Sequence, residues 1–250
     1  MQQTISLPMY RPQSHETRAL LQAIQLLLAE RNIVARLAFP AADLLAHWRG
    51  SDVLLSQTCG FPLMTALPDV QVVGGFHYSA PGCEGVNYRS ALVVRLEDQN
   101  KTLADFFGRR AACNAVDSQS GFNALRKMVT PLAQEGAFFS QVVISGSHRQ
   151  SLVEIVNQRA DLAAIDCVTL ALLRRDEPQR MRELAVIGYT PSTPGLPLIT
   201  AAQTPRETVQ GLREVLHTLV TSARYAERCA STLISGFSTL PREAYRVLLS

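Results

Sequence analysis

The sequence lacks the features that mark several large functional classes. It has no cluster of lysines and arginines and no Gly-Lys-Ser/Thr phosphate loop. Its 24 basic side chains are scattered among 21 acidic ones, so the net charge is only +3 and no nucleic-acid or lipid surface is evident. The missing phosphate loop argues against a nucleoside triphosphatase. No apolar run is long enough to cross a membrane, because Gln22 and Gln25 interrupt the best candidate.

Cysteine is also sparse. The five cysteines are Cys59, Cys83, Cys113, Cys167 and Cys229. They are odd in number, widely spaced and free of any CxxC pair, so we expect no disulfide framework, no metal site and no other cofactor. Reduced thiols are typical of the cytoplasm, and the first residues lack the basic and apolar regions of a signal peptide. The sequence therefore predicts a cytoplasmic protein, or a periplasmic one if a leader has been removed.

The composition is that of a folded globule. Apolar residues make up 47% of the 250 residues and charged residues 18%. Hydrophobic alternation predicts strands at 4–7, 33–37, 52–56, 70–76, 88–96, 110–116, 141–145, 161–166 and 183–189. Helical spacing predicts helices at 15–31 after an N-cap at Ser14, at 41–48, 101–107 and 167–174, after 120 and 148, from 205 to about 225, and after Pro241. Strands and helices alternate almost throughout, which favours an α/β fold with mostly parallel sheets.

Two turn-rich stretches divide the predicted elements. The loop at 78–87 and the proline-rich stretch at 189–197 bracket a compact middle segment. We therefore expect two lobes, one made of residues 1–85 plus 190–250 and the other of residues 86–189. The stretch TPSTPGLPLIT that follows Tyr189 is typical of a crossing segment rather than of a domain core. Further along, Thr204 and Glu207 predict a capping box with Pro205 at the first helical position.

The most informative stretch is DSQSGFNALR at residues 117–126, with an echo, SGSH, at 145–148. Each copy follows a predicted strand, contains small hydroxyl residues and glycine, and leads into a helix. A helix start carries unpaired N–H groups and a partial positive charge. With Ser118, Gln119 and Ser120 beside it, and Gly121 permitting close approach, this helix start predicts a seat for a small oxyanion.

Further polar candidates lie near the ends of other predicted elements. His148 stands at the second helix start, where it could donate a hydrogen bond to the same anion. Asp166 ends an apolar strand, so its carboxylate needs partners, which a ligand or the following helix N–H groups could supply. Tyr10 and Tyr88 would suit the walls of a cleft for an organic anion, because each joins an apolar ring to a polar tip.

These motifs resemble a known family. The order DSQSG, then GSH, then a buried strand ending in AAID is similar to the phosphate- and phosphonate-type, PhnD-like substrate-binding proteins of ABC importers, in the type II periplasmic-binding-protein superfamily. The resemblance covers most of the chain and is strongest over residues 88–200. It implies two α/β lobes joined by two crossing segments, which close on a small anion in the cleft between them. It also implies a non-enzymatic transport role with an ABC permease as partner.

The resemblance assigns roles to particular residues. It places Ser118, Ser120 and Gly121 in the anion loop, with Gln119 where relatives often carry a hydroxyl residue. His148 matches the second anchor, and Asp166 matches the region where relatives hold an amine or line the cleft. Tyr10, Gln57 and Thr58 stand where the first lobe usually supplies contacts.

A second hypothesis keeps the clamshell fold and changes the task. In this hypothesis, the chain is an intracellular ligand sensor or an enzyme. The one candidate nucleophile is Cys59, in the turn QTCGFP after a predicted buried strand. No histidine and acidic residue stand at a telling spacing from it, so the preferred prediction is anion binding without catalysis.

Overall fold

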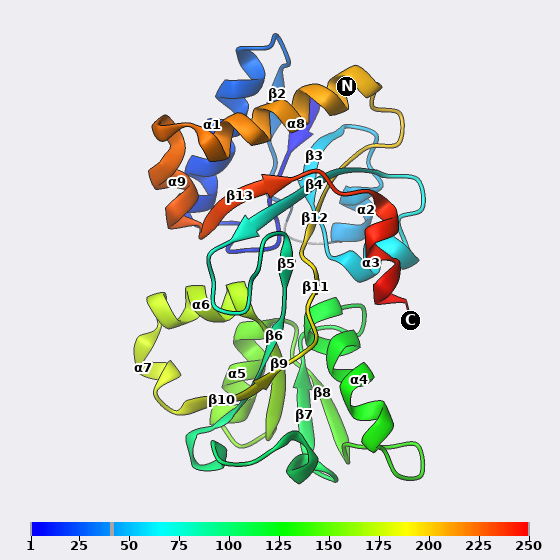
Figure 1. The fold of residues 1–250 in the computed structure, drawn as a ribbon, viewed down its shortest axis with the longest axis vertical. Helices are drawn as coiled ribbons and strands as arrows, with labels where there is room; N and C mark the ends of the chain where they lie inside the picture. Colours follow the sequence, from blue (N-terminus) through cyan, green and yellow to red (C-terminus); the bar gives the residue numbers. More distant parts are fainter. Residues whose placement is uncertain (1, 41–42, 250) are drawn as a thin grey trace. The chain divides into compact units, whose positions relative to one another are not determined.

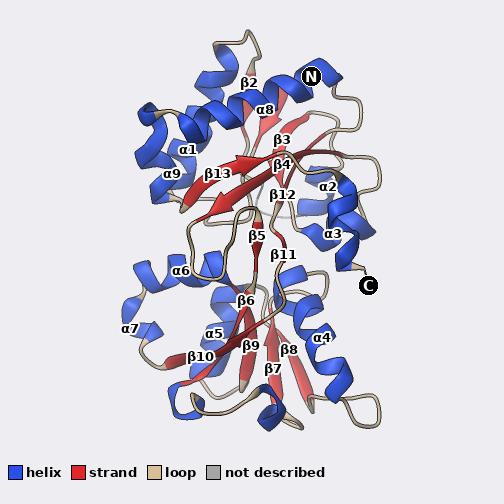
Figure 2. Ribbon diagram, in the orientation of Figure 1, coloured by secondary structure: helices blue, strands red, loops and turns tan. Residues whose placement is uncertain are grey.

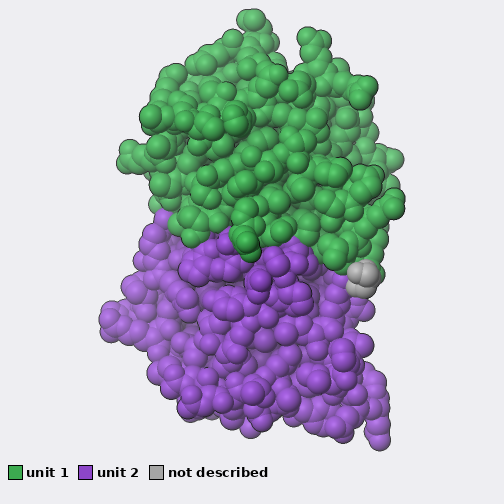
Figure 3. All heavy atoms as spheres, in the orientation of Figure 1, with its two compact units in different colours: residues 1–79, 84–87, 194–250 green, residues 80–83, 88–193 purple. Residues whose placement is uncertain are grey.

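The computed structural model describes residues 2–40 and 43–249 (Figure 1). The chain divides into two compact units, coloured separately in Figure 3. Unit 1 comprises residues 1–79, 84–87 and 194–250, and unit 2 comprises residues 80–83 and 88–193. The short strands β5 (Asn87–Tyr88) and β11 (Thr193–Pro194), which pair with each other, lie where the chain passes from one unit to the other.

Unit 1 is built on a six-stranded sheet in the order β13-β4-β12-β3-β1-β2. Its strands are β1 (Gln3–Ile5), β2 (Ala35–Leu37), β3 (Val53–Gln57), β4 (Gln71–Tyr78), β12 (Pro197–Thr200) and β13 (Ile234–Ser238). Strand β1 pairs in parallel with β2 and β3, whereas β12 is antiparallel to both β3 and β4, and β13 is antiparallel to β4. Thus β1 to β4 share one direction and the two late strands run against them.

Helices flank this sheet (Figure 2). They are α1 (His15–Ala29), α2 (Leu44–Trp48), α3 (Gly60–Thr65), α8 (Arg206–Thr221) and α9 (Ala226–Ser231), with 3₁₀ segments at Ala223–Tyr225 and Arg242–Leu248. The predicted N-cap of α1 is confirmed, since Ser14 Oγ accepts a hydrogen bond from Thr17 N at 3.1 Å. The predicted start of the second helix at 41 lies outside the described residues. Helices α1 and α8 pack their apolar faces into one core with the sheet.

Two predictions for unit 1 are wrong. The second half of the proline-rich stretch is the fully buried strand β12, not a crossing segment. The strand tolerates Pro197 because this residue occupies the first strand position, where it needs no ladder hydrogen bond. The predicted capping box is absent: Thr204 Oγ1 instead shares a 2.7 Å hydrogen bond with Thr200 Oγ1, and α8 begins without a side-chain cap. The sequence also gave no sign of β13, and it predicted only a turn where α3 forms.

Unit 2 contains a five-stranded sheet in the order β10-β6-β9-β7-β8. Its strands are β6 (Ser90–Arg95), β7 (Arg110–Cys113), β8 (Gln141–Ile144), β9 (Leu162–Asp166) and β10 (Leu184–Tyr189). Its helices are α4 (Ala124–Val129), α5 (His148–Val156), α6 (Cys167–Asp176) and α7 (Pro178–Met181), with 3₁₀ segments at Leu96–Asp98, Leu103–Phe106 and Thr130–Leu132. Strands β7, β8 and β9 pair in parallel, and β6 runs antiparallel to β9 and β10.

The central strand β9 shows why this sheet is covered on both faces. All of its residues are buried. Leu162 and Ala164 belong to one apolar cluster, whereas Ala163 and Ile165 belong to another. Successive side chains of a strand point to opposite faces, so the continuous apolar run predicted at 161–166 fills two cores.

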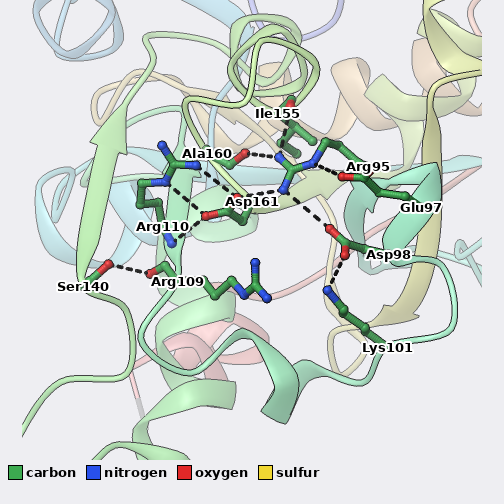
Figure 4. Close-up of polar contacts among 10 residues, drawn as sticks. All are labelled: Arg95, Glu97, Asp98, Lys101, Arg109, Arg110, Ser140, Ile155, Ala160 and Asp161. Atoms are coloured by element: carbon green, nitrogen blue, oxygen red, sulfur yellow. Dashed lines mark hydrogen bonds and ion pairs between the residues drawn. The ribbon is translucent and has the colours of Figure 1, made fainter.

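An ionic cluster lies at the end of the sheet where β7 and β9 begin. Figure 4 shows Arg95 and Arg110 on either side of the Asp161 carboxylate. Arg95 Nη2 lies 2.8 Å from Asp161 Oδ1, and Arg110 Nε lies 3.1 Å from Asp161 Oδ2. Arg95 also donates to Ala160 O and forms an ion pair with Asp98, which in turn pairs with Lys101. The cluster joins β6, β7 and the residue before β9 at one end of these strands.

Within the described ranges, no helix combines the length and the hydropathy that a membrane crossing requires.

Candidate functional site

The predicted anion loop lies at the carboxyl end of β7. After Cys113 the chain turns, and Ser118 caps a π-helical turn at Gln119–Asn123 that leads directly into α4. Ser118 Oγ accepts a hydrogen bond from Gly121 N at 3.0 Å, and Ser118 O accepts one from Asn123 N at 2.9 Å. A π-helical turn is wider than an α-helical one and often marks a functional site. Here it aligns a run of small polar residues that the protein buries.

The second predicted motif meets this loop. Helix α5 begins at His148 after an N-cap at Ser147, whose Oγ accepts a hydrogen bond from Gln150 N at 3.1 Å. His148 Nε2 lies 2.9 Å from Ser120 Oγ, so the two motifs share a hydrogen bond. Burial lowers the pKa of His148 to about 4, and its imidazole is therefore uncharged at neutral pH. When Nε2 carries the proton it donates to Ser120, which leaves the serine hydroxyl hydrogen for another acceptor.

Two buried polar atoms beside this contact have no hydrogen-bond partner within the described part of the chain. They are His148 Nδ1 and Asn114 Oδ1. Both side chains lie against Gly121: a Cβ atom at that position would stand 1.9 Å from Asn114 Oδ1 and 3.2 Å from His148 Cε1. Buried polar atoms are almost always paired, so two such atoms around one glycine indicate a place for a ligand or for ordered water.

Gln119 is held by its own network. Its side chain is 2% exposed, and its Oε1 accepts a hydrogen bond from Asn123 Nδ2 at 2.7 Å. Asn123 Oδ1 in turn accepts a hydrogen bond from Arg126 Nη2 at 2.9 Å. This chain of contacts fixes the amide of Gln119 and ties the loop to α4.

Asp166 and Tyr88 are both buried in unit 2. Asp166 Oδ1 accepts hydrogen bonds from Val168 N at 2.8 Å and Thr169 N at 3.0 Å, so it caps α6. This is the structural alternative that the sequence left open for Asp166. Tyr88 is the last residue of β5, and 4% of its surface is exposed.

Two of the three predicted residues of unit 1 contact Tyr78. Gln57 Nε2 donates to Tyr78 Oη at 3.0 Å, and the ring of Tyr10 packs edge-on against the Tyr78 ring with centroids 5.2 Å apart. Thr58 is fully buried, and its Oγ1 has no hydrogen-bond partner among the described residues. Unit 1 therefore has a polar group of its own at the carboxyl end of β3.

Sequence reasoning missed several polar residues of these sites. In unit 2 it missed Asn114, because the strand predicted at 110–116 included this residue, whereas β7 ends at Cys113. In unit 1 it predicted a helix at 41–48 and gave His47 no role of its own. His47 Nε2 instead lies 2.9 Å from Ser6 Oγ, which lies 2.7 Å from Ser56 Oγ. Burial lowers the pKa of His47, although the nearby Asp52 acts to raise it. These contacts depend on the pairing of β1 with β3, which the sequence does not display.

Other chemistry has less support in the structure. Cys59 is buried, at the residue before α3. The described residues contain no cluster of three or more His, Cys, Asp or Glu side chains that could hold a metal ion. A cavity of about 240 Å³ opens between α4 and the segment at 133–139, but its walls are largely apolar and include none of the predicted site residues. An apolar cavity does not suit an anion.

Comparison with known protein families identifies the family of this chain. A family model described as the periplasmic substrate-binding protein of ABC phosphonate transporters matches residues 62–245, most of the chain. No curated protein sequence matches it significantly. The match confirms the predicted family resemblance and the predicted role in substrate binding for transport. Since the family consists of binding proteins rather than enzymes, it also supports the prediction that the chain is not an enzyme, and it implies a small-molecule ligand and a permease partner.

Solved structures with the same fold come from several bacteria. A binding-protein component of an ABC phosphonate transporter from Pseudomonas aeruginosa matches with a TM-score of 0.79 and 17% identity, over 100% of this chain and 86% of that one. PhnD1 from Prochlorococcus marinus, in complex with methylphosphonate, matches with a TM-score of 0.78 and 14% identity over 99% and 96%. A Xanthomonas citri protein bound to ATP matches with a TM-score of 0.73 and 15% identity over 98% and 94%. These matches confirm the predicted type II, two-lobed fold.

Proposed function

Because the chain belongs to the family of periplasmic substrate-binding proteins of ABC phosphonate transporters, we propose that unit 2 binds the anionic group of a phosphonate- or phosphate-like ligand on Ser118–Gly121 and His148. The observation that carries the proposal is a pair of buried atoms around Gly121, His148 Nδ1 and Asn114 Oδ1, that have no hydrogen-bond partner among the described residues. An oxyanion with several oxygens can meet hydrogen-bond donors from several directions at once. This suits the loop, its helical turn and the start of α5.

The donors in this seat are uncharged. The Ser118 hydroxyl group and the first N–H groups of the helical turn can donate to oxygens of the anion. Ser120 and neutral His148 together supply one further donor: the Ser120 hydroxyl group when His148 Nε2 carries the proton, or His148 Nδ1 when it does not. The amide of Asn114 can present either its nitrogen or its oxygen, so it can meet a deprotonated or a protonated ligand oxygen. Hydrogen bonds to a charged group contribute about 1.5–3 kcal/mol each, so a few of them reach roughly micromolar affinity, about −8 kcal/mol, after the costs of ordering.

Relatives support the class of ligand. The Prochlorococcus structure holds methylphosphonate and the Xanthomonas structure holds ATP, two ligands that both carry tetrahedral phosphorus oxyanions. We infer that the ligand of this chain carries the same kind of group. An organic sulfonate or carboxylate is the second candidate, because the same neutral donors would accept its charge.

Unit 1 supplies candidate contacts of its own. Thr58 is the strongest of them, because its hydroxyl group is fully buried and has no partner among the described residues. Tyr10 and Gln57 are candidates through their shared neighbour Tyr78. Asp166 and Tyr88 act in this proposal as supports of unit 2, since Asp166 is occupied in capping α6.

The test is a binding series on ligand-free protein. The protein is unfolded to release any bound ligand, refolded, and titrated calorimetrically with methylphosphonate, phosphite, phosphate, methanesulfonate and acetate. We expect heat and a raised melting temperature with at least one phosphorus oxyanion. A ligand at 100 times its Kd stabilises the folded state by about 2.7 kcal/mol, which shifts the melting temperature by several degrees. No response to any phosphorus oxyanion, with a response to methanesulfonate or acetate, would replace the phosphonate class by the second candidate, and no response to any of the five would contradict the proposal.

A further inference from the structure

Two cysteines that lie far apart in the sequence meet within unit 2. Cys83 Sγ and Cys167 Sγ are 3.3 Å apart, in hydrogen-bond contact. Cys83 belongs to segment 80–83, the short piece of unit 2 that lies between two stretches of unit 1 along the chain. Cys167 is the first residue of α6 and is 2% exposed. The wide spacing of the cysteines argued against a disulfide framework, but the fold brings this one pair together.

Independent backbone contacts hold both members of the pair. Cys83 N donates to Ala80 O at 3.0 Å, which closes a turn, and Cys167 N donates to Arg89 O at 3.1 Å. The turn can lie against α6 because of Gly82. Its φ is +101°, and a Cβ atom there would stand 3.2 Å from Cys167 Cβ. The contact between the sulfur atoms is thus imposed by the main chain on both sides.

The other three cysteines are placed differently. Cys59, Cys113 and Cys229 are all buried. Cys113 lies in the apolar core of unit 2, and Cys229 Sγ donates to Leu219 O at 3.6 Å. The sulfur atoms of Cys83 and Cys167 are in mutual contact, and of the five cysteines, all of which the structure describes, Cys83 is the one that is not fully buried.

We propose that Cys83 and Cys167 form a disulfide bond that staples segment 80–83 to α6. The bond requires the sulfur atoms to move from 3.3 Å to about 2.05 Å, which side-chain rotation can supply for two thiols already in contact. The oxidant is an external disulfide, such as oxidised glutathione or an oxidised thiol–disulfide oxidoreductase. The proposal concerns unit 2 alone and does not depend on the identity of the ligand.

The chemistry proceeds in two exchanges. Cys83, the more exposed thiol, loses its proton and attacks one sulfur of the external disulfide, forming a mixed disulfide and expelling one external thiolate. Cys167 then loses its proton and attacks Cys83 Sγ, which expels the second external thiolate. The two protons pass to the two leaving thiolates. The protein loses two electrons and two protons, and one external disulfide becomes two thiols.

The surroundings of the pair affect the rate of the first exchange. The hydrogen bond to Cys167, burial and the nearby charge of Asp166 raise the pKa of Cys83. A raised pKa leaves little of the reactive thiolate at neutral pH. We therefore expect oxidised glutathione to act slowly and an oxidoreductase to act faster.

The test compares the folded protein in reducing buffer and in buffer with excess oxidised glutathione. Thiols are then counted in denaturant and the mass is measured. We expect the five thiols of the reduced chain to fall by two, with a mass loss of two hydrogens and no dimer on a non-reducing gel. Cys83→Ser and Cys167→Ser should each abolish the intramolecular bond. Cys229→Ser is the matched control: serine can also donate to Leu219 O, and this variant should still lose two thiols.

A second readout tests the staple itself. Closing a loop of this length raises the melting temperature, on the order of 5–10 °C for a chain of this size. The oxidised wild type and the oxidised Cys229→Ser variant should show the rise, and the two serine variants at positions 83 and 167 should not. Retention of all five thiols in wild type after exposure to glutathione and to an oxidoreductase would overturn the proposal. So would a loss of two thiols that persists in Cys83→Ser.

Discussion

The two ends of the sheet in unit 2 differ in how their buried polar groups are paired. Where β7 and β9 begin, the buried carboxylate of Asp161 is fully engaged: it contacts Arg95 at 2.8 Å and both the side chain and the backbone N–H of Arg110 at 3.1 Å. Where β7 ends, His148 Nδ1 and Asn114 Oδ1 are buried and have no hydrogen-bond partner in the described part of the chain. A buried carboxylate with both oxygens paired supports the fold, whereas unpaired buried groups cost stability unless a ligand or water meets them. The difference separates the structural end of the sheet from the end that we assign to the ligand.

The two ends also differ in charge. Burial alone would raise the pKa of Asp161, but hydrogen bonds from Arg110 and Arg95 outweigh it and hold that pKa well below its usual range. At the other end, burial lowers the pKa of His148 to about 4. At neutral pH the structural end therefore contains fixed ions, and the ligand end contains neutral donors.

The largest expected effect is at the structural end. Asp161→Ala leaves Arg95 and Arg110 without their shared carboxylate and should lower the free energy of unfolding by about 3–5 kcal/mol, measured by chemical denaturation. Asp176→Ala is the control, because its pair with Arg175 is exposed and should contribute at most about 1 kcal/mol. Equal losses in the two variants would mean that the cluster at Asp161 stabilises the fold no more than an exposed ion pair does.

Ser120→Ala tests the ligand end. Loss of one hydrogen bond to a charged ligand should weaken methylphosphonate or phosphate binding by about 10- to 150-fold in calorimetry. Ser140→Ala removes an exposed serine hydroxyl near the structural end, where it donates to Arg109 O, and should leave the affinity unchanged. If both variants bind like wild type, Ser120 does not contact the anion.

Gly121→Ala should affect both stability and affinity. The added Cβ would stand 1.9 Å from Asn114 Oδ1, so the loop or Asn114 must move, at a cost of about 1–3 kcal/mol in unfolding free energy and at least tenfold in affinity. Gly188→Ala serves for comparison, since its Cβ would meet nothing closer than Leu92 Cδ1 at 3.7 Å. A Gly121→Ala protein with wild-type affinity would contradict the packing described around this glycine.

The smallest expected effect is a pH dependence at the ligand end. The folded-state pKa of His148, about 4, is below that of a free histidine, so the unfolded chain takes up this proton first as the pH falls. Its contribution to stability is complete above about pH 6.5 and is lost towards pH 4, by about 1 kcal/mol over the first pH unit. His148→Gln should remove this part of the pH dependence of the unfolding free energy, whereas Gln in place of the exposed His217 should not. Identical pH profiles for His148→Gln and wild type would show that His148 is not buried in its neutral form.

Local patterns were enough to predict much of unit 2 and the start of α1 in unit 1. The capped start of α1 in unit 1, the strands at 88–96 and 161–166, and the turn at 118–121 all follow from short-range spacing of apolar, hydroxyl and glycine residues. The sequence could also place His148 at a helix start, although its contact with Ser120 depends on the parallel pairing of β7 with β8.

Features that depend on distant partners could not be predicted. Strand β12 is recognisable only once β3 and β4 are in place on either side of it, and the proline-rich sequence around it suggested a linker. Thr204 fits a capping box by its sequence, yet its hydroxyl finds Thr200 instead. The contact between Cys83 and Cys167 and the role of Asn114 beside Gly121 arise from tertiary packing alone.

The most direct test of the central claim is to follow backbone amide signals by NMR while ligand-free protein is titrated with methylphosphonate. We expect the largest shifts at Ser120, Gly121 and His148, with small shifts at Arg110 and Asp161 at the other end of the same sheet. Binding that shifts other amides and leaves Ser120, Gly121 and His148 unchanged would contradict that claim.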